Sequence, residues 1–122
     1  MTRLASCTFA CLVATLAVLI AHAENEKYSS KYDHIDVNEV LANSHLRNQY
    51  VRCLINISPC TMGSARFLKD IFAEAFITKC KKCTDKQIYI FNVITDWFTK
   101  NEPETWNHIV RTTIEEAQRK NA

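Results

Sequence analysis

Residues 53–83 read CLINISPCTMGSARFLKDIFAEAFITKCKKC, and this stretch holds four cysteines, Cys53, Cys60, Cys80 and Cys83. Six, nineteen and two residues separate them. In an oxidising compartment such spacing predicts a disulfide framework, whereas in a reducing cytosol the same residues indicate a metal site or a redox pair. The interpretation of the cysteines therefore depends on where the protein is located.

The N-terminus has the pattern of a secretory signal peptide. Arg3 provides a short basic start, residues 4–20 form an apolar run, and Ala21-His22-Ala23 supplies the small residues of a cleavage site. We therefore predict that residues 1–23 are removed and that residues 24–122 form the secreted chain. The alternative is a membrane anchor, but the apolar run is short for a span and a cleavage pattern follows it directly. Removal takes two of the six cysteines and leaves the four named above.

The mature chain of 122 − 23 = 99 residues is predicted to be a single small domain, a size at which covalent bonds add needed stability. Four cysteines allow three pairings. We favour Cys53–Cys60 and Cys80–Cys83, because each pair is close enough in sequence to bridge a turn between two helices. Each bond would contribute on the order of 2 kcal/mol. A four-cysteine zinc site and a thioredoxin-like redox role for the Cys80–Cys83 motif are the alternatives.

Apolar residues repeat at helical spacing through most of the mature chain. Asp36, with Glu39 three residues later, signals the first helix, and Thr84 with Gln87 forms a capping box before the fourth. Pro103 marks the start of the fifth. The predicted helices cover about 37–43, from 46 to before Ser58-Pro59, 67–76, 84–99 and 103–119. No strand-like alternation appears, so the fold class is all-α, a compact bundle of five to six short helices.

Two further features concern the placement of these segments. Apolar residues between Ile88 and Phe98 cover most of the circumference of the helix 84–99, which predicts that this helix lies in the middle of the structure. Residues 24–31 are polar and lack helical periodicity, so we interpret them as a mobile or loosely docked arm. Tyr28 and Tyr32 could still dock on an apolar surface.

Composition argues against several classes of function. The mature chain keeps fourteen basic and thirteen acidic residues, a formal charge of 14 − 13 = +1, which argues against a nucleic-acid surface. The cluster Lys79, Lys81, Lys82 and Lys86 is interpreted as a solvated helix junction. The histidines are scattered without metal-ligand spacing, and no phosphate loop or nucleophile elbow occurs. We therefore propose neither an enzyme nor a metal or cofactor site.

Large aromatic side chains are abundant for a chain of this size. They stand in broad stripes on several predicted helices, which either pack solidly together or enclose an apolar cavity. Periodicity alone does not choose between these arrangements, and a stripe at helical spacing more often forms a solid core. The stripes and nearby tyrosines comprise Phe67, Phe72, Phe76, Phe91, Phe98, Trp97, Trp106, Tyr32, Tyr50 and Tyr89.

Several short motifs resemble the insect chemosensory protein family, also called the olfactory segment D family. They are KYSSKYDHID at 27–36, YVRCL at 50–54, PCT at 59–61 and KCKKCTDKQ at 79–87. The resemblance runs from about residue 27 to residue 110. It implies a secreted bundle of about six helices, disulfides between neighbouring cysteines, and an internal channel. Such channels take long-chain fatty acids, their esters or pheromone components, so the resemblance favours a cavity over a solid core.

The resemblance also implies ligand-binding residues. Tyr32 and Tyr50 match positions that line or gate the channel in the family, and Trp106 matches a tryptophan near it. Helical faces add a further six residues to this candidate site, namely Leu46, Leu68, Ile71, Phe72, Ile94 and Trp97. We expect a monomeric carrier of small hydrophobic ligands, without nucleic acid and without stable membrane insertion after cleavage. The alternative is a secreted, disulfide-stapled helical interaction factor that acts through its surface in development, immunity or host contact.

The sequence departs from the family pattern at three places. The middle cysteine gap is nineteen residues where eighteen is usual, and Ser58 stands where a glycine is common. The Tyr-Asp-Pro motif that normally separates the fifth helix from a sixth is absent. Because no proline interrupts residues 111–114, the fifth helix is expected to continue to about Arg119.

Overall fold

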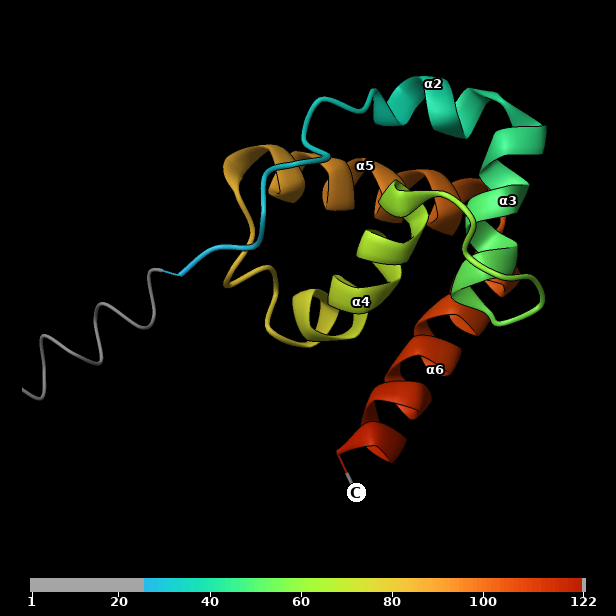
Figure 1. The fold of residues 1–122 in the computed structure, drawn as a ribbon. Helices are drawn as coiled ribbons and strands as arrows, with labels where there is room; N and C mark the ends of the chain where they lie inside the picture. Colours follow the sequence, from blue (N-terminus) through green and yellow to red (C-terminus); the bar gives the residue numbers. More distant parts are fainter. Residues whose placement is uncertain (1–25, 122) are drawn as a thin grey trace, which may run out of the picture.

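A computed structural model describes residues 26–121, and this part of the chain contains helices and no strand (Figure 1). The predicted all-α class is confirmed, and each helix overlaps one of the five predicted segments. The predicted signal peptide, residues 1–23, lies outside the described residues. The helices are α2 (Val37–Ala42), α3 (Ser44–Leu54), α4 (Gly63–Ile77), α5 (Asp85–Asn101) and α6 (Pro103–Lys120).

Local signals set the ends of these helices. The Asp36 side chain caps α2 by accepting hydrogen bonds from two backbone N–H groups of the first turn. Thr84 and Gln87 form the predicted reciprocal capping box at the start of α5. Pro103 is in the first turn of α6, which continues without a break to Lys120. The expected continuous last helix is therefore confirmed.

The helices cross one another around an aromatic core. α3 packs against α2, α4 and α6, and α6 packs against α3, α4 and α5, whereas α5 contacts α2 and α6 (Figure 1). Phe72 on α4 is fully buried, and its ring centroid lies 5.8 Å from that of Phe91 and 5.9 Å from that of Trp106. Such aromatic pairs each add about 0.5–1.5 kcal/mol beyond the burial of their surface. This cluster joins α4, α5 and α6.

Both predicted disulfides are confirmed. Cys53 near the end of α3 is bonded to Cys60 in the following loop, and Cys80 to Cys83 between α4 and α5, with a Cα–Cα distance of 4.9 Å in each pair. Lys79 and Cys80 have positive φ angles of 56° and 62°, so the chain turns sharply as it leaves α4. Because all four sulfurs are in disulfides, they leave no thiolate for the alternative zinc site.

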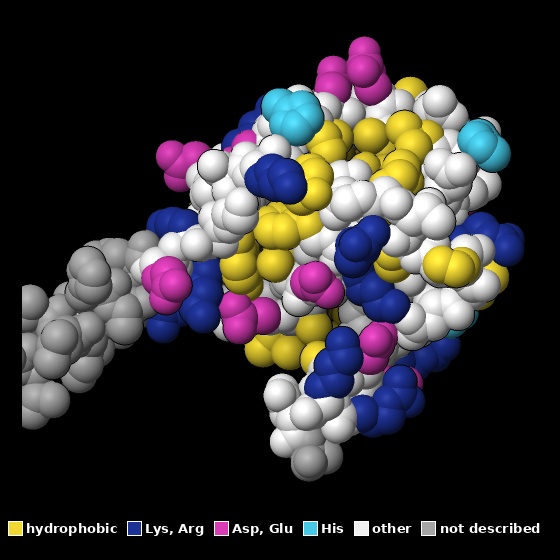
Figure 2. All heavy atoms as spheres, in the orientation of Figure 1, with side chains coloured by type: hydrophobic (Ala, Val, Ile, Leu, Met, Phe, Trp, Pro, Cys, Tyr) yellow, Lys and Arg dark blue, Asp and Glu magenta, His cyan; other side chains and the backbone are white. Residues whose placement is uncertain are grey.

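Two predictions about placement are wrong. α5 is not central, because Ile88 and Tyr89 on its outer face are 39% and 46% exposed. Residues 28–31 are not a loose arm, because Tyr28 donates its backbone N–H to the Lys82 carbonyl (2.8 Å). The docking of Tyr28 on an apolar surface is confirmed, because its side chain packs against the hydrophobic core. Figure 2 shows that hydrophobic side chains also reach the surface elsewhere on the face it presents, between charged groups.

Candidate ligand cavity

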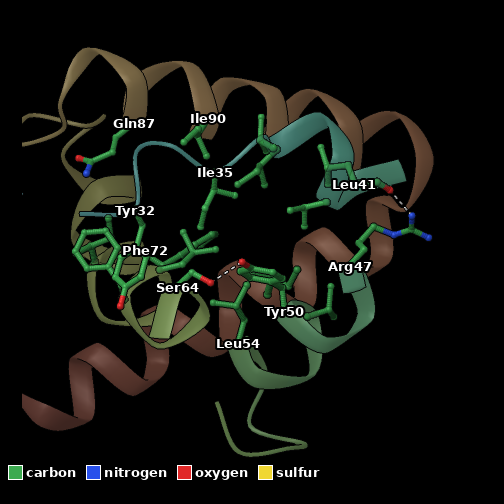
Figure 3. A pocket seen from close by; sticks show the side chains of 18 of the residues that line it. Tyr32, Ile35, Leu41, Arg47, Tyr50, Leu54, Ser64, Phe72, Gln87 and Ile90 are labelled. Atoms are coloured by element: carbon green, nitrogen blue, oxygen red, sulfur yellow. Dashed lines mark hydrogen bonds between the residues drawn. The ribbon is translucent and has the colours of Figure 1, made fainter. Parts of the chain in front are cut away.

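An apolar cavity of about 100 Å³ lies among the helices (Figure 3). Side chains from helices α2 to α6 and from the segment before α2 line it, and most of them are aliphatic or aromatic. The cavity volume is several times the volume that one water molecule needs, yet its apolar walls offer a water molecule few hydrogen-bonding partners. The lining residues are Tyr32, Asp33, Ile35, Val37, Val40, Leu41, Arg47, Tyr50, Val51, Leu54, Ser64, Phe67, Leu68, Ile71, Phe72, Gln87, Ile90, Ile94, Phe98, Trp106 and Ile109.

The structure brings together most of the candidate residues predicted from the sequence. Seven of the nine line the cavity, namely Tyr32, Tyr50, Leu68, Ile71, Phe72, Ile94 and Trp106. Leu46 and Trp97 are not among the lining residues. The Trp97 ring packs edge-on against Phe98 (4.9 Å between centroids), and the Arg47 guanidinium lies over the Trp97 ring, 4.4 Å from its centroid. Trp97 therefore packs against two cavity-lining residues, Phe98 and Arg47, without lining the cavity itself.

Two kinds of lining residue were not among those predicted from the sequence. Val37, Val40 and Leu41 recur at helical spacing along one face of α2, so the amphipathic pattern could have identified them. The polar members Ser64 and Gln87 carry no such signal, because nothing in their local sequence indicates that they face an apolar space. Only the packing of α4 and α5 places them there.

Two hydroxyl groups meet at the cavity wall. Tyr50 Oη on α3 and Ser64 Oγ in the first turn of α4 lie 2.7 Å apart, and each can act as donor or acceptor. Figure 3 shows this hydrogen bond between the two helices, with apolar side chains around it. A pair of hydroxyls has two protons and four lone pairs, so one internal bond leaves hydrogen-bonding capacity for a further group.

The segment before α2 is fastened to α5 by a buried glutamine. Gln87 is 4% exposed, and its Nε2 donates to the Ser29 carbonyl (2.8 Å) and to Asp33 Oδ1 (3.0 Å). Its Oε1 accepts from the Thr84 backbone N–H (3.0 Å), and Thr84 Oγ1 donates to Asp33 Oδ2 (2.7 Å). These bonds satisfy both carboxylate oxygens of Asp33 and hold the segment across the cavity.

A second attachment joins the same segment to α4. The Tyr28 hydroxyl donates to Glu74 Oε1 (2.7 Å), and Lys82 Nζ lies 3.6 Å from the same oxygen. Partial burial, together with the hydrogen bond to the carboxylate, raises the pKa of Tyr28 above its ordinary value. The same hydrogen bond, with the nearby Lys82, lowers the pKa of Glu74. The charged carboxylate is therefore the form that holds the segment.

Tyr32 covers one side of the cavity, over the start of α4. Its ring centroid lies 5.4 Å from that of Phe67. The single glycine of the chain, Gly63, stands directly under the tyrosine, because an added Cβ there would lie 2.5 Å from Tyr32 Oη. The absence of a side chain at Gly63 thus lets the Tyr32 ring lie close to α4.

None of the helices within residues 26–121 combines the length and the hydrophobicity that a membrane span requires. The same residues contain no group of three or more His, Cys, Asp or Glu side chains that could hold a metal ion. The geometry described above instead defines a class of protein: a small disulfide-bonded helical bundle that encloses an apolar space with a few polar groups on its wall.

Comparisons with known proteins identify the family. Residues 28–121 match the insect pheromone-binding family A10/OS-D. Ejaculatory bulb-specific protein 3 of Drosophila melanogaster is 35% identical over 91 residues, which cover 75% of this chain and 71% of that protein. Allergen Tha p 1 of Thaumetopoea pityocampa is 37% identical over 98 residues, which cover 80% of this chain and 77% of that protein.

A solved structure agrees with these matches. A chemosensory protein in complex with bromo-dodecanol superposes with a TM-score of 0.67 at 32% identity, covering 78% of this chain and 95% of that chain. The chain belongs to the insect pheromone-binding family A10/OS-D, and the resemblance seen in its sequence motifs is confirmed.

Proposed function

We propose that the protein is a carrier that binds small hydrophobic ligands in the cavity, in the class of long-chain fatty acids, their esters, and pheromone- or odorant-like molecules. The observation that carries the proposal is the apolar space bounded by helices α2 to α6. The bromo-dodecanol complex of a related chemosensory protein supports it, because that ligand is a long alkyl chain with one polar group.

The driving force is the transfer of alkyl surface out of water. Each buried methylene contributes about 0.8 kcal/mol, with little dependence on chain type, so we expect broad specificity. A cavity of about 150 Å³ in another protein accommodates benzene, and the present cavity is about 100 Å³. A long alkyl chain therefore needs more room than the ligand-free cavity offers, and binding must displace lining side chains or shift helices.

Displacement of an apolar fluorescent probe tests the proposal. The mature chain should enhance the emission of a naphthylamine fluorophore, and long-chain alcohols, esters or acids should displace it with affinities that rise with chain length. The expected gain is up to about fourfold per methylene, the equivalent of 0.8 kcal/mol. Absence of probe binding, or affinities that do not depend on chain length, would refute the carrier function.

Secretion is part of the same proposal. Expressed in insect cells, the protein should appear in the medium with Glu24 as its first residue, because cleavage is predicted after Ala23. A chain that still begins at Met1 would contradict this. We also propose that the carrier is a monomer, which sizing of the secreted protein against its mass would test.

Action through the molecular surface is the alternative function, and two exposed side chains favour it. Ile57 and Ile77 are 57% and 62% exposed. A substitution in the cavity should distinguish the two functions, because it should abolish ligand uptake but leave a surface activity intact. Tyr50 is better suited to this test than Trp106, since Trp106 is 6% exposed within the aromatic core and its loss would also destabilise the fold.

A further inference from the structure

Two segments far apart in the sequence lie side by side at one corner of the molecule. Tyr28 donates its backbone N–H to the Lys82 carbonyl (2.8 Å), and Gln87 Nε2 donates to the Ser29 carbonyl (2.8 Å). Residues 27–31 are therefore held against the loop between α4 and α5 and against the first turn of α5 (Figure 1). The contact brings two lysines of the first segment next to four of the second, namely Lys27, Lys31, Lys79, Lys81, Lys82 and Lys86.

These six lysines are called the basic corner below. Five of them are exposed and Lys82 is partly buried. In the described part of the chain, Lys82 lies 3.6 Å from Glu74 Oε1, and the other five lysines form no ion pair. Figure 2 shows Lys and Arg side chains at the end of the molecule where the described chain begins, with hydrophobic side chains beside them. The basic corner therefore presents cations that no carboxylate of residues 26–121 neutralises at close range.

The basic corner is the positive end of a nearly neutral molecule. Residues 26–33 and 74–87 together contain six lysines and four carboxylates, a formal charge of 6 − 4 = +2. The predicted mature chain carries 14 − 13 = +1, so the rest of it carries 1 − 2 = −1. Two of the four carboxylates, Asp33 and Glu74, already accept hydrogen bonds from the protein. An anionic partner is therefore attracted to this corner more than to the remaining surface.

The chemistry of the basic corner favours a lipid surface over a protein or a nucleic acid. All six cations are lysines, whereas arginine is preferred in nucleic-acid recognition and lysine is depleted in protein interfaces. Clustered lysines beside exposed apolar side chains are typical of binding to anionic lipid. Ile77 at the end of α4 and Ile88 in the first turn of α5 are 62% and 39% exposed, and they flank the loop that carries three of the lysines.

The basic corner also adjoins the wall of the cavity. The segment that carries Lys31 continues directly into Tyr32 and Ile35, which line the cavity. A lipid surface that contains fatty acids is negatively charged at neutral pH, because a carboxyl group has an ordinary pKa of about 4.3. A surface that holds ligands of the proposed class therefore has the charge that complements the basic corner.

We propose that the basic corner docks the protein on anionic lipid surfaces, without insertion into them. This inference goes beyond the proposed carrier function, because it assigns a partner to the surface of the protein. Each lysine near such a surface raises the binding constant by up to about fivefold, the equivalent of about 1 kcal/mol. Docking places the segment that covers the cavity next to a source of hydrophobic ligands.

Sedimentation with lipid vesicles tests the docking with the unaltered mature chain. Vesicles of phosphatidylcholine alone are compared with vesicles that also contain phosphatidylglycerol, an anionic lipid. At an ionic strength of about 0.01 M, where the Debye length is about 30 Å, the chain should sediment with the anionic vesicles only. An increase to about 0.15 M shortens the Debye length to about 8 Å and should weaken this binding by about tenfold.

A matched pair of charge reversals tests the location, at about 0.1 M ionic strength, where the Debye length is about 10 Å. Lys81→Glu changes the charge of the basic corner by two units and should weaken binding by about 25-fold, or fivefold per unit. Lys100→Glu makes the same change near the other end of α5, roughly 20 Å along the helix from Lys86, and should weaken binding less than about twofold. Both side chains are exposed, so the melting temperature should change little in either variant.

Equal binding to neutral and anionic vesicles, or binding to neither, would overturn the inference. Equal weakening by the two reversals would overturn it as well, because the attraction would then follow net charge alone. Retention of polyglutamate without binding of anionic vesicles would assign the basic corner to an acidic protein instead. Because these measurements need no ligand in the cavity, failure of docking is distinguishable from failure of the carrier function, which probe displacement measures.

Discussion

Filling the cavity from within should stabilise the protein and impair ligand uptake. Leu68 lines the cavity from α4 and is only partly buried, so Leu68→Phe can project additional volume into the space. An unfilled cavity costs about 24 cal/mol per Å³, so 100 Å³ corresponds to a ceiling of about 2.4 kcal/mol. One phenyl ring fills part of that volume. We therefore expect about 1 kcal/mol of added stability in the ligand-free protein.

Thermal unfolding and probe displacement measure the two effects together. A gain of about 1 kcal/mol raises the melting temperature of a domain of this size by about 4–8 °C, and dodecanol affinity should fall at the same time. If the interior were solid, the same substitution would overpack it and cost about 1–3 kcal/mol. A lowered melting temperature with unchanged dodecanol binding would therefore refute the cavity as the ligand site.

Leu46→Phe provides the matched control for this experiment. It makes the same chemical change on α3, at a partly buried residue that is not among those lining the cavity. Its stability should change by no more than about 0.5 kcal/mol, and ligand affinity should stay the same. Weakened binding in this variant would instead show that Leu46 contacts the ligand, as the sequence predicted.

Three further predictions concern the attachments of the fold. Tyr28→Phe should cost roughly 0.5 kcal/mol at neutral pH. Because the pKa of Glu74 is lowered in the folded state, the stabilisation by the Tyr28–Glu74 hydrogen bond should be lost as the pH falls below 4.5, the ordinary pKa of a glutamate. Below that pH, the urea unfolding midpoints of Tyr28→Phe and of the unaltered protein should therefore converge. Gln87→Ala leaves the Ser29 carbonyl and Asp33 Oδ1 without their donor and should lower the free energy of unfolding by about 1–3 kcal/mol. Amide hydrogen exchange in residues 28–33 should become faster, and an unchanged exchange rate would contradict the role of Gln87 in holding this segment. Replacing Cys53 and Cys60 together by serine should cost about 2 kcal/mol in the same unfolding assay, and an unaltered unfolding midpoint would contradict the loop-entropy argument.

Much of this fold was determined locally by the sequence. The capping box at Thr84 and Gln87, the proline at the start of α6 and the close cysteine pairs act over a few residues, so their effects could be predicted without knowledge of the packing. The motifs around the cysteines also sufficed to indicate the family. Seven cavity-lining residues followed from the family resemblance and from helical periodicity.

The tertiary structure decided what periodicity leaves open. A helical stripe shows that a face is apolar, but the crossing of neighbouring helices determines whether that face meets a solid core, a cavity or solvent. For this reason Trp97 packs on Arg47 outside the cavity, and part of α5 remains exposed. The Tyr50–Ser64 contact joins residues on separate helices, so only the packing of α3 against α4 brings these two hydroxyls together.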